Sequence, residues 1–305
     1  MNRAWTFTFP SARKRDMAFL EAFPEATATQ LAMATAVQFI ENHLHADIKV
    51  ADMAMAVHYS LFHFCRIFNQ VTHHPPYDYL VRRRLTEAAH RLADGARVTE
   101  VALDCQFGSP EAFSRAFKRL FGLLPSQWQK SGWIDPRCFM TPLTPTHLTH
   151  RSHAASVRPQ VVERPSRTLT GLMTAVDEEA TAVSALWRQM RECLGDALAQ
   201  QPAWAVCHYL PHYPQTGVYY LAAVESAANI AFPPVLVNKT MPSGLYACFP
   251  LPASVAARQL LNDYIYQTWL PQSRYQLSYP LEVLAFTGWT VEPVSATLEI
   301  PIRPV

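Results

Sequence analysis

The sequence predicts a two-domain protein in which an all-α domain precedes an α+β domain, and three observations support this fold class. Residues 59–122 carry two helix-turn-helix patterns in series. Residues 131–160 are rich in Pro, Thr, Ser and His and show little periodicity, as expected of a connection between domains. Beyond residue 161, expected strands and helices follow one another in the same order twice.

Length and composition are consistent with this division. The chain has 305 residues, half of them hydrophobic, which is enough for two cores. We divide it into an N-terminal extension (1–28), a tandem helix-turn-helix domain (29–130), a linker (131–160) and an α+β domain (161–305). The first domain carries 11 Lys and Arg against 9 Asp and Glu, the second 8 against 11. Only the first domain therefore favours a polyanion.

The first helix-turn-helix pattern combines a helix over 50–57, a turn at 58–59 and a helix that begins at Ser60, a suitable N-cap residue. Apolar residues at helical spacing predict the buried stripe of the second helix: Leu61, Phe64, Phe68 and Val71. The other face carries Phe62, Arg66 and Asn69. Arg can pair with guanine, Asn with adenine, and an apolar ring can contact a thymine methyl group, so this face suits a DNA major groove.

The second pattern repeats this plan after a helix over 98–105 and a turn at 106–108. Ser109 is a suitable N-cap residue, Pro110 fits the first helical position, and Glu111 suits the positive end of the helix dipole. Gly122 ends the helix. The stripe expected to be buried contains Phe113, Phe117, Leu120 and Phe121.

The outward face of this second helix is basic. Ala112, Arg115 and Arg119 share it, with Lys118 on the flank toward phosphate. A single helix of this kind is also typical of an ordinary protein surface. Two copies, each after a short helix and a turn, favour recognition of double-stranded DNA.

The second half predicts two copies of a strand-helix-strand-strand unit. The expected elements are a strand at 168–176, a helix at 178–198, strands at 203–209 and 217–224, a strand at 239–249, a helix at 253–268, and strands at 281–287 and 296–302. Such a pseudo-twofold repeat places two sheet halves side by side, each backed by a helix. A groove between them suits a small ligand.

Glu282 is the main candidate for binding that ligand, because it lies in the apolar run 281–286, where a charge is costly unless it is paired. A carboxylate among aromatic rings favours a cation. Trp187, Trp204 and Tyr220 are candidate groove residues, with core packing as the alternative for at least one of them. An ordinary strand with Glu282 facing water is also compatible with the sequence.

The helical half resembles the AraC/XylS family of transcriptional regulators. The run from Phe107 to Ser126 resembles the family signature around the second recognition helix, Tyr59 to Phe68 resembles the first, and 77–91 resembles the bridging helix. The resemblance implies a DNA-binding regulator, an activator that contacts RNA polymerase. It also implies base-reading roles for the outward residues, among them four that differ from the Trp or Gln of similar activators: Phe62, Cys65, Pro110 and Glu111. We therefore expect a different DNA target.

The second half resembles GyrI-like effector-binding domains over residues 161–305. Short motifs carry this resemblance, such as Tyr279-Pro280-Leu281-Glu282 and the closing Leu298 to Ile302. It implies a small-molecule effector, cationic or amphipathic, held near Glu282.

Two other classes of function are compatible with the second domain. Some GyrI-like domains are hydrolytic, with Glu282 as a possible general base, and the groove could instead hold a protein segment. The sequence shows no nucleophile, metal site or second carboxylate placed to act with Glu282, and its cysteines and histidines lack metal-ligand spacing. We therefore expect no enzyme activity, no metal and no cofactor. No run is long and apolar enough for a membrane, so we expect a cytoplasmic protein.

Overall fold

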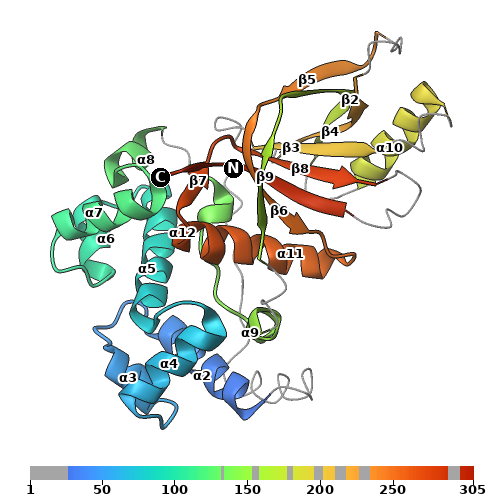
Figure 1. Ribbon diagram of the computed structural model, residues 1–305. Helices are drawn as coiled ribbons and strands as arrows, with labels where there is room; N and C mark the ends of the chain where they lie inside the picture. Colours follow the sequence, from blue (N-terminus) through green and yellow to red (C-terminus); the bar gives the residue numbers. More distant parts are fainter. Residues whose placement is uncertain are drawn as a thin grey trace. The chain divides into compact units, whose positions relative to one another are not determined.

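The computed structural model describes residues 27–131, 134–152, 158–176, 181–195, 202–209, 218–226, 234–287 and 296–305 (Figure 1). Contacts between residues are concentrated within two compact units. The first comprises Met1–Arg84 with Thr141–His153, and the second comprises Leu85–Met140 with Ala154–Val305. Helix α5 (Pro76–Ala93) contributes residues to both.

The first unit is helical. Besides the start of α5, it contains α2 (Ala28–Asn42), α3 (Val50–Met55), α4 (Leu61–Thr72) and α9 (Pro145–Ser152). Thr27 begins α2 with a capping box, in which its side chain and that of Gln30 each accept a backbone N–H. Phe64, Phe68 and Leu148 are fully buried in the core of this unit. Helix α9 lies within the segment that the sequence suggested was a linker.

The helical part of the second unit holds the second helix-turn-helix. It contains the rest of α5 together with α6 (Val98–Asp104), α7 (Pro110–Phe121), α8 (Pro125–Ser131) and the 3-10 turn η1 (Pro136–Cys138). Phe113 and Phe117 are fully buried. The Trp128 indole N–H of α8 donates to the Ala89 carbonyl of α5 at 2.8 Å, which fastens α8 to that helix.

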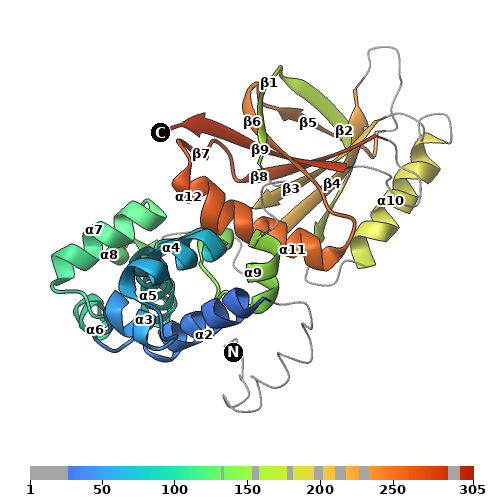
Figure 2. The ribbon, with the colours of Figure 1, turned by 60° about the horizontal axis from the view of Figure 1, so that its bottom comes forward.

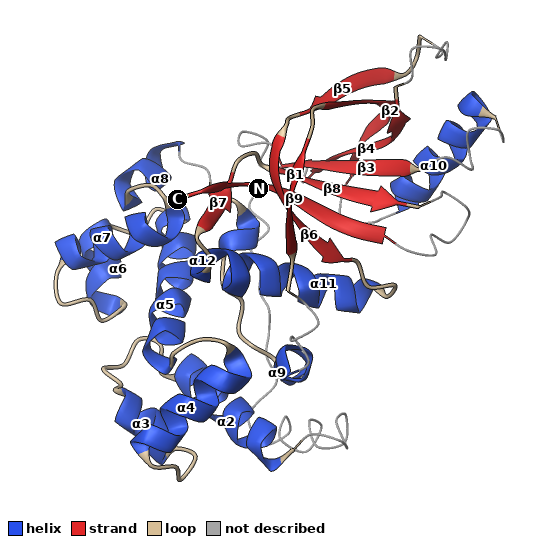
Figure 3. Cartoon of the chain, viewed as in Figure 1, coloured by secondary structure: helices blue, strands red, loops and turns tan. Residues whose placement is uncertain are grey.

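Nine described strands of the same unit form one antiparallel sheet (Figure 3). They are β1 (Gln160–Arg164), β2 (Arg167–Val176), β3 (Ala203–Tyr209), β4 (Val218–Glu225), β5 (Val237–Met241), β6 (Gly244–Pro250), β7 (Tyr275–Leu277), β8 (Leu281–Phe286) and β9 (Ala296–Pro304). Their order is β1-β6-β9-β8-β3-β4-β2-β5, with β7 paired to β9. The helices are α10 (Thr181–Leu194), α11 (Val255–Tyr264), the π-helical turn η3 (Ile265–Trp269) and α12 (Leu270–Gln272).

This order confirms the pseudo-twofold repeat. The first copy is β2-α10-β3-β4 and the second is β6-α11-β8-β9. In the sheet the copies run β2-β4-β3 and β8-β9-β6, and they meet where β3 pairs with β8. The prediction of a single strand over 239–249 is wrong, because this segment forms two strands, β5 and β6. They are separated at Pro242, which has no N–H to donate to a neighbouring strand, and β6 begins at Gly244 with φ 142°.

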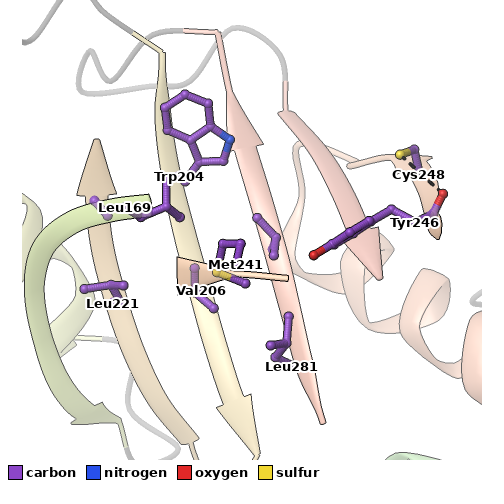
Figure 4. Close-up of a cluster of buried hydrophobic side chains, with 10 residues drawn as sticks. Leu169, Trp204, Val206, Leu221, Met241, Tyr246, Cys248 and Leu281 are labelled. Atoms are coloured by element: carbon purple, nitrogen blue, oxygen red, sulfur yellow. Dashed lines mark hydrogen bonds between the residues drawn. The ribbon is translucent and has the colours of Figure 1, made fainter. Parts of the chain in front are cut away.

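The two faces of the sheet have separate apolar clusters, because successive strand residues point to opposite faces. Helices α10 and α11 cover one face (Figure 2), where Tyr220 and Ala222 pack with Leu186. On the other face ten buried residues pack together (Figure 4). They are Leu169, Trp204, Val206, Leu221, Ala223, Met241, Tyr246, Cys248, Leu281 and Val283.

Candidate nucleic-acid interface and ligand site

Helix α4 presents most of the outward face that its sequence predicts. Ser60 caps it, accepting the His63 backbone N–H at 3.4 Å, and the left-handed His73 ends it. Phe62 is 82% exposed, so its ring is accessible to a partner. Arg66 and Asn69 are exposed and Cys65 is half-buried.

One expectation for the buried side of α4 is wrong. Phe64, Phe68 and Val71 are buried, but Leu61 is 51% exposed. Leu61 is the first residue of the helix, where the chain has only begun to enter the core.

Helix α7 has stronger end signals. The Ser109 hydroxyl accepts the Ala112 N–H at 3.1 Å, Pro110 begins the helix, and Gly122 ends it with φ 81°. Hydrogen bonding to Ser109 and to the first-turn backbone lowers the pKa of Glu111. Glu111 therefore stays ionised at the positive end of the helix dipole.

The outward face of α7 is basic and accessible. Arg115, Lys118 and Arg119 are exposed, whereas Pro110 and Ala112 are half-buried. Among the described residues no ion pair involves Arg115, Lys118 or Arg119. Exposed charges without a close ion pair are accessible to phosphates and base edges.

Glu282 does not face water. It lies on β8, only 5% exposed, and its carboxylate accepts three hydrogen bonds. Tyr266 of η3 donates to Oε1 at 2.6 Å, Tyr209 of β3 donates to Oε2 at 2.9 Å, and Arg137 of η1 donates to Oε1 at 2.6 Å. The buried charge is therefore both hydrogen-bonded and paired, as burial requires.

Two tyrosine rings flank the guanidinium group that pairs with Glu282. The Arg137 Cζ atom lies 3.5 Å from the ring centroid of Tyr209 and 4.2 Å from that of Tyr266. Burial, and next the charge of Glu282, raise the pKa of both tyrosines well above the ordinary value. Both hydroxyls therefore remain protonated donors to the carboxylate. Carboxylate and rings together form a cage for a flat cation.

The predicted groove aromatics divide between the two faces of the sheet. Cys207 lies opposite both Glu282 and Tyr220 in the strand register, so these three share the helix-covered face. Trp187 of α10 joins them by donating to the Tyr220 hydroxyl at 3.0 Å. Trp204 is three positions from Cys207 and therefore points to the opposite face, where Arg167 lies over its ring.

Sequence reasoning missed the residues that complete the cage. Tyr209 and Tyr266 lie inside an expected strand and an expected helix, but nothing in the sequence pairs either with Glu282. Arg137 lies 145 positions before Glu282, in a segment without periodicity. Its contact could not be inferred from spacing.

Comparison with known proteins gives a family for each half of the chain. A helix-turn-helix domain matches residues 53–131, and a GyrI-like small molecule binding domain matches residues 158–300. The chain is 33% identical over 94 residues to the HTH-type transcriptional activator AarP of Providencia stuartii, covering 30% of this chain and 70% of AarP. The chain belongs to the AraC-type family of helix-turn-helix transcriptional regulators. The family resemblance drawn from the sequence is thus confirmed, as is the order of an α domain before an α+β domain.

Other AraC-type relatives match over the same region. The probable transcriptional regulator LumQ of Photobacterium leiognathi is 32% identical over 111 residues, 36% of this chain and 45% of LumQ. The right origin-binding protein of Escherichia coli K12 is 34% identical over 94 residues, 30% of this chain and 32% of its own length. The chain thus matches less than half the length of these two relatives. In the part of the chain that the structure describes, no helix is long and apolar enough to cross a membrane.

Proposed function

We propose that the protein is a sequence-specific DNA-binding transcriptional regulator whose activity responds to a small cation held at Glu282. The pair of capped helices α4 and α7, whose outward faces expose Arg66 and Arg115, carries this proposal. The family of the chain and its match to a small molecule binding domain support it. In this reading residues 29–130 form the DNA-binding domain and residues 161–305 the effector-binding domain.

On DNA, each helix would occupy a major groove, and the two would read faces about one turn apart, roughly 34 Å. Arg66 and Arg115 suit guanine, Asn69 suits adenine, and Phe62 suits a thymine methyl group. Glu111 suits a cytosine amine. Lys118 and Arg119 suit phosphates, which would make affinity fall with salt. Activation would follow from contact with RNA polymerase.

We further propose that the domain is not an enzyme. The two oxygens of Glu282 accept hydrogen bonds from Arg137, Tyr209 and Tyr266. A general base needs a lone pair directed at a water or substrate proton. In this arrangement the carboxylate is set to hold a cation.

Selection of bound sequences from a random DNA pool tests the DNA-binding proposal. We expect one enriched motif for the unchanged protein, and loss of that enrichment in the double variant Arg66→Ala with Arg115→Ala. Arg303→Ala, an exposed arginine at the end of β9, serves as the matched control and should keep the motif. An identical motif from the double variant would show that neither helix recognises bases through these arginines.

A further inference from the structure

Arg137 belongs to the connection between the two matched domains, not to the sheet that carries Glu282. It lies in η1, after the helix-turn-helix match ends at residue 131 and before the GyrI-like match begins at residue 158. Its side chain is nevertheless only 10% exposed, and that of Glu282 is 6% exposed. A guanidinium group from outside the sheet thus fills the cage beside the buried carboxylate.

Asp135 holds Arg137 in this position. The Arg137 Nε donates to Asp135 Oδ1 at 2.9 Å, and Nη2 donates to Oδ2 at 2.5 Å. Burial alone would lower the pKa of Arg137, but Tyr266, Asp135 and Glu282 together raise it above the ordinary value. The guanidinium therefore stays charged. Two buried carboxylates share it, so the cage would be strongly anionic without a cation.

The residues just after Arg137 are packed into the second helix-turn-helix. The Phe139 ring lies 5.6 Å from Phe121 of α7 and 6.3 Å from Trp128 of α8, measured between ring centroids. The Met140 N–H donates to the hydroxyl of Thr86 in α5 at 3.0 Å. Because Arg137 and Phe139 are two residues apart, a displacement of one pulls directly on the other.

We propose that Arg137 is a tethered occupant of the cation cage, and that an effector binds by exchanging with it at Glu282. The ligand class follows from the occupant: a flat organic monocation, such as an amidinium or guanidinium compound, that fits between Tyr209 and Tyr266. Exchange releases residues 135–138 and loosens the packing of Phe139 against α7 and α8. This inference rests on the proposed effector site at Glu282.

Exchange between Arg137 and the ligand predicts a specific change in the affinity of the cage for that ligand. Arg137 is tethered to the cage and therefore competes with a ligand at a high effective concentration. A ligand that binds only the vacant cage has an apparent affinity equal to its intrinsic affinity multiplied by the fraction of molecules in which the cage is vacant. If the cage is vacant in no more than one molecule in ten, removal of Arg137 strengthens ligand binding at least about tenfold. A merely structural Arg137 would have the opposite effect, because its loss would disorder the cage.

Calorimetric binding of benzamidinium to the full-length chain tests the exchange, with neutral benzamide as the matched ligand. We expect Arg137→Gln to bind benzamidinium at least about tenfold more tightly than the unchanged protein. Arg303→Gln should bind like the unchanged protein, and benzamide should bind to none of them. Equal or weaker binding by Arg137→Gln overturns the exchange, as does the absence of benzamidinium binding in every variant.

Glu282→Gln separates this inference from the function on which it rests. Binding that vanishes in Glu282→Gln but does not strengthen in Arg137→Gln keeps the effector site and rejects the exchange. Binding that is unchanged in Glu282→Gln rejects the effector site itself.

Hydrogen exchange of the Met140 amide provides a second readout if Arg137→Gln fails to fold. In the unchanged protein, saturating benzamidinium should speed exchange of this amide by about tenfold, while the Ala112 amide at the start of α7 stays protected. Unaltered exchange at Met140 in the ligand-bound protein overturns the release of the connecting segment.

Discussion

We propose binding roles for two charged sites, the outward face of α7 and the Glu282 cage, and the structure holds their charges in opposite ways. Arg115 is exposed and has no ion pair among the described residues, whereas Glu282 is 5% exposed and accepts three donors. An exposed charge contributes little to folding and is free for a partner. A buried charge is part of the fold, so its ligand must take the place of an existing contact. The two sites should therefore respond differently to substitution.

The largest effect is expected on stability, at the buried site. Arg137→Gln leaves Glu282 and Asp135 buried without a cation, and we expect a loss of about 3–5 kcal/mol in the free energy of unfolding. Urea denaturation measures it, and benzamidinium should restore part of the loss by mass action. Arg164→Gln is the comparison within the same sheet. Arg164 pairs with the buried Glu299 at 2.6 Å, but its side chain is 35% exposed and water can replace it. A stability loss at Arg137 no greater than at Arg164 would contradict this contrast.

Acidification should cause a similar loss in the free energy of unfolding, and the cause is again a buried group. His74 is fully buried, and burial lowers its pKa from 6.5 to about 4. The folded state thus favours neutral His74, while the unfolded chain takes up a proton below pH 6.5. Its contribution is complete above pH 6.5 and is lost as the pH falls toward 4, by about 3 kcal/mol. His74→Gln should flatten this part of the pH profile of unfolding. A profile unchanged by the substitution would remove His74 as the cause.

Arg115→Ala should have the reverse signature, with weaker binding and an unchanged fold. We expect a loss of about 1–3 kcal/mol in DNA affinity and relaxed preference at one base pair. The unfolding free energy should stay within about 0.5 kcal/mol of the unchanged protein. Fluorescence anisotropy with the selected DNA, beside urea denaturation, measures both. A large loss of stability would show that this side chain, like Glu282, belongs to the fold.

The smallest effects concern the helix caps, and they compare α4 with α7. Ser109→Ala and Ser60→Ala should each lower the unfolding free energy by about 1 kcal/mol. The hydrogen bond of Ser109 is the shorter, at 3.1 Å against 3.4 Å for Ser60, so Ser109→Ala should cost more. Thermal unfolding of the two variants measures the difference. A larger shift for Ser60 would reverse the ranking.

The same contrast explains which features the sequence could predict. The start of α4 and both ends of α7 agree with the sequence prediction to within one residue, because Ser60, Ser109, Pro110 and Gly122 act on their own neighbours in the chain. The repeated unit of the sheet was also predicted from local patterns. Strands β1 and β7 were missed because five and three residues give too little alternation to recognise.

The cage is a different case, because long-range pairing creates it. The apolar run around Glu282 marked the residue itself, but its partners depend on the meeting of β3 with β8 and on where η1 lies. Trp204 shows the same limit. Strand alternation places Trp204 on the face opposite the cage once Cys207 is known to lie opposite Glu282. That register cannot be predicted from the sequence of either strand alone.

The junction of β3 with β8 also sets an order of events during synthesis. Tyr209 comes from the first repeat, and Tyr266 and Glu282 come from the second, so neither repeat alone contains the cage. Domains fold as units from the N-terminus as the chain emerges. The recognition helices α4 and α7 precede β8 in the chain, but α7 lies in the same compact unit as the sheet. A nascent chain would therefore lack the cage until β8 had emerged, and the proposed effector control would begin only after Glu282 had left the ribosome.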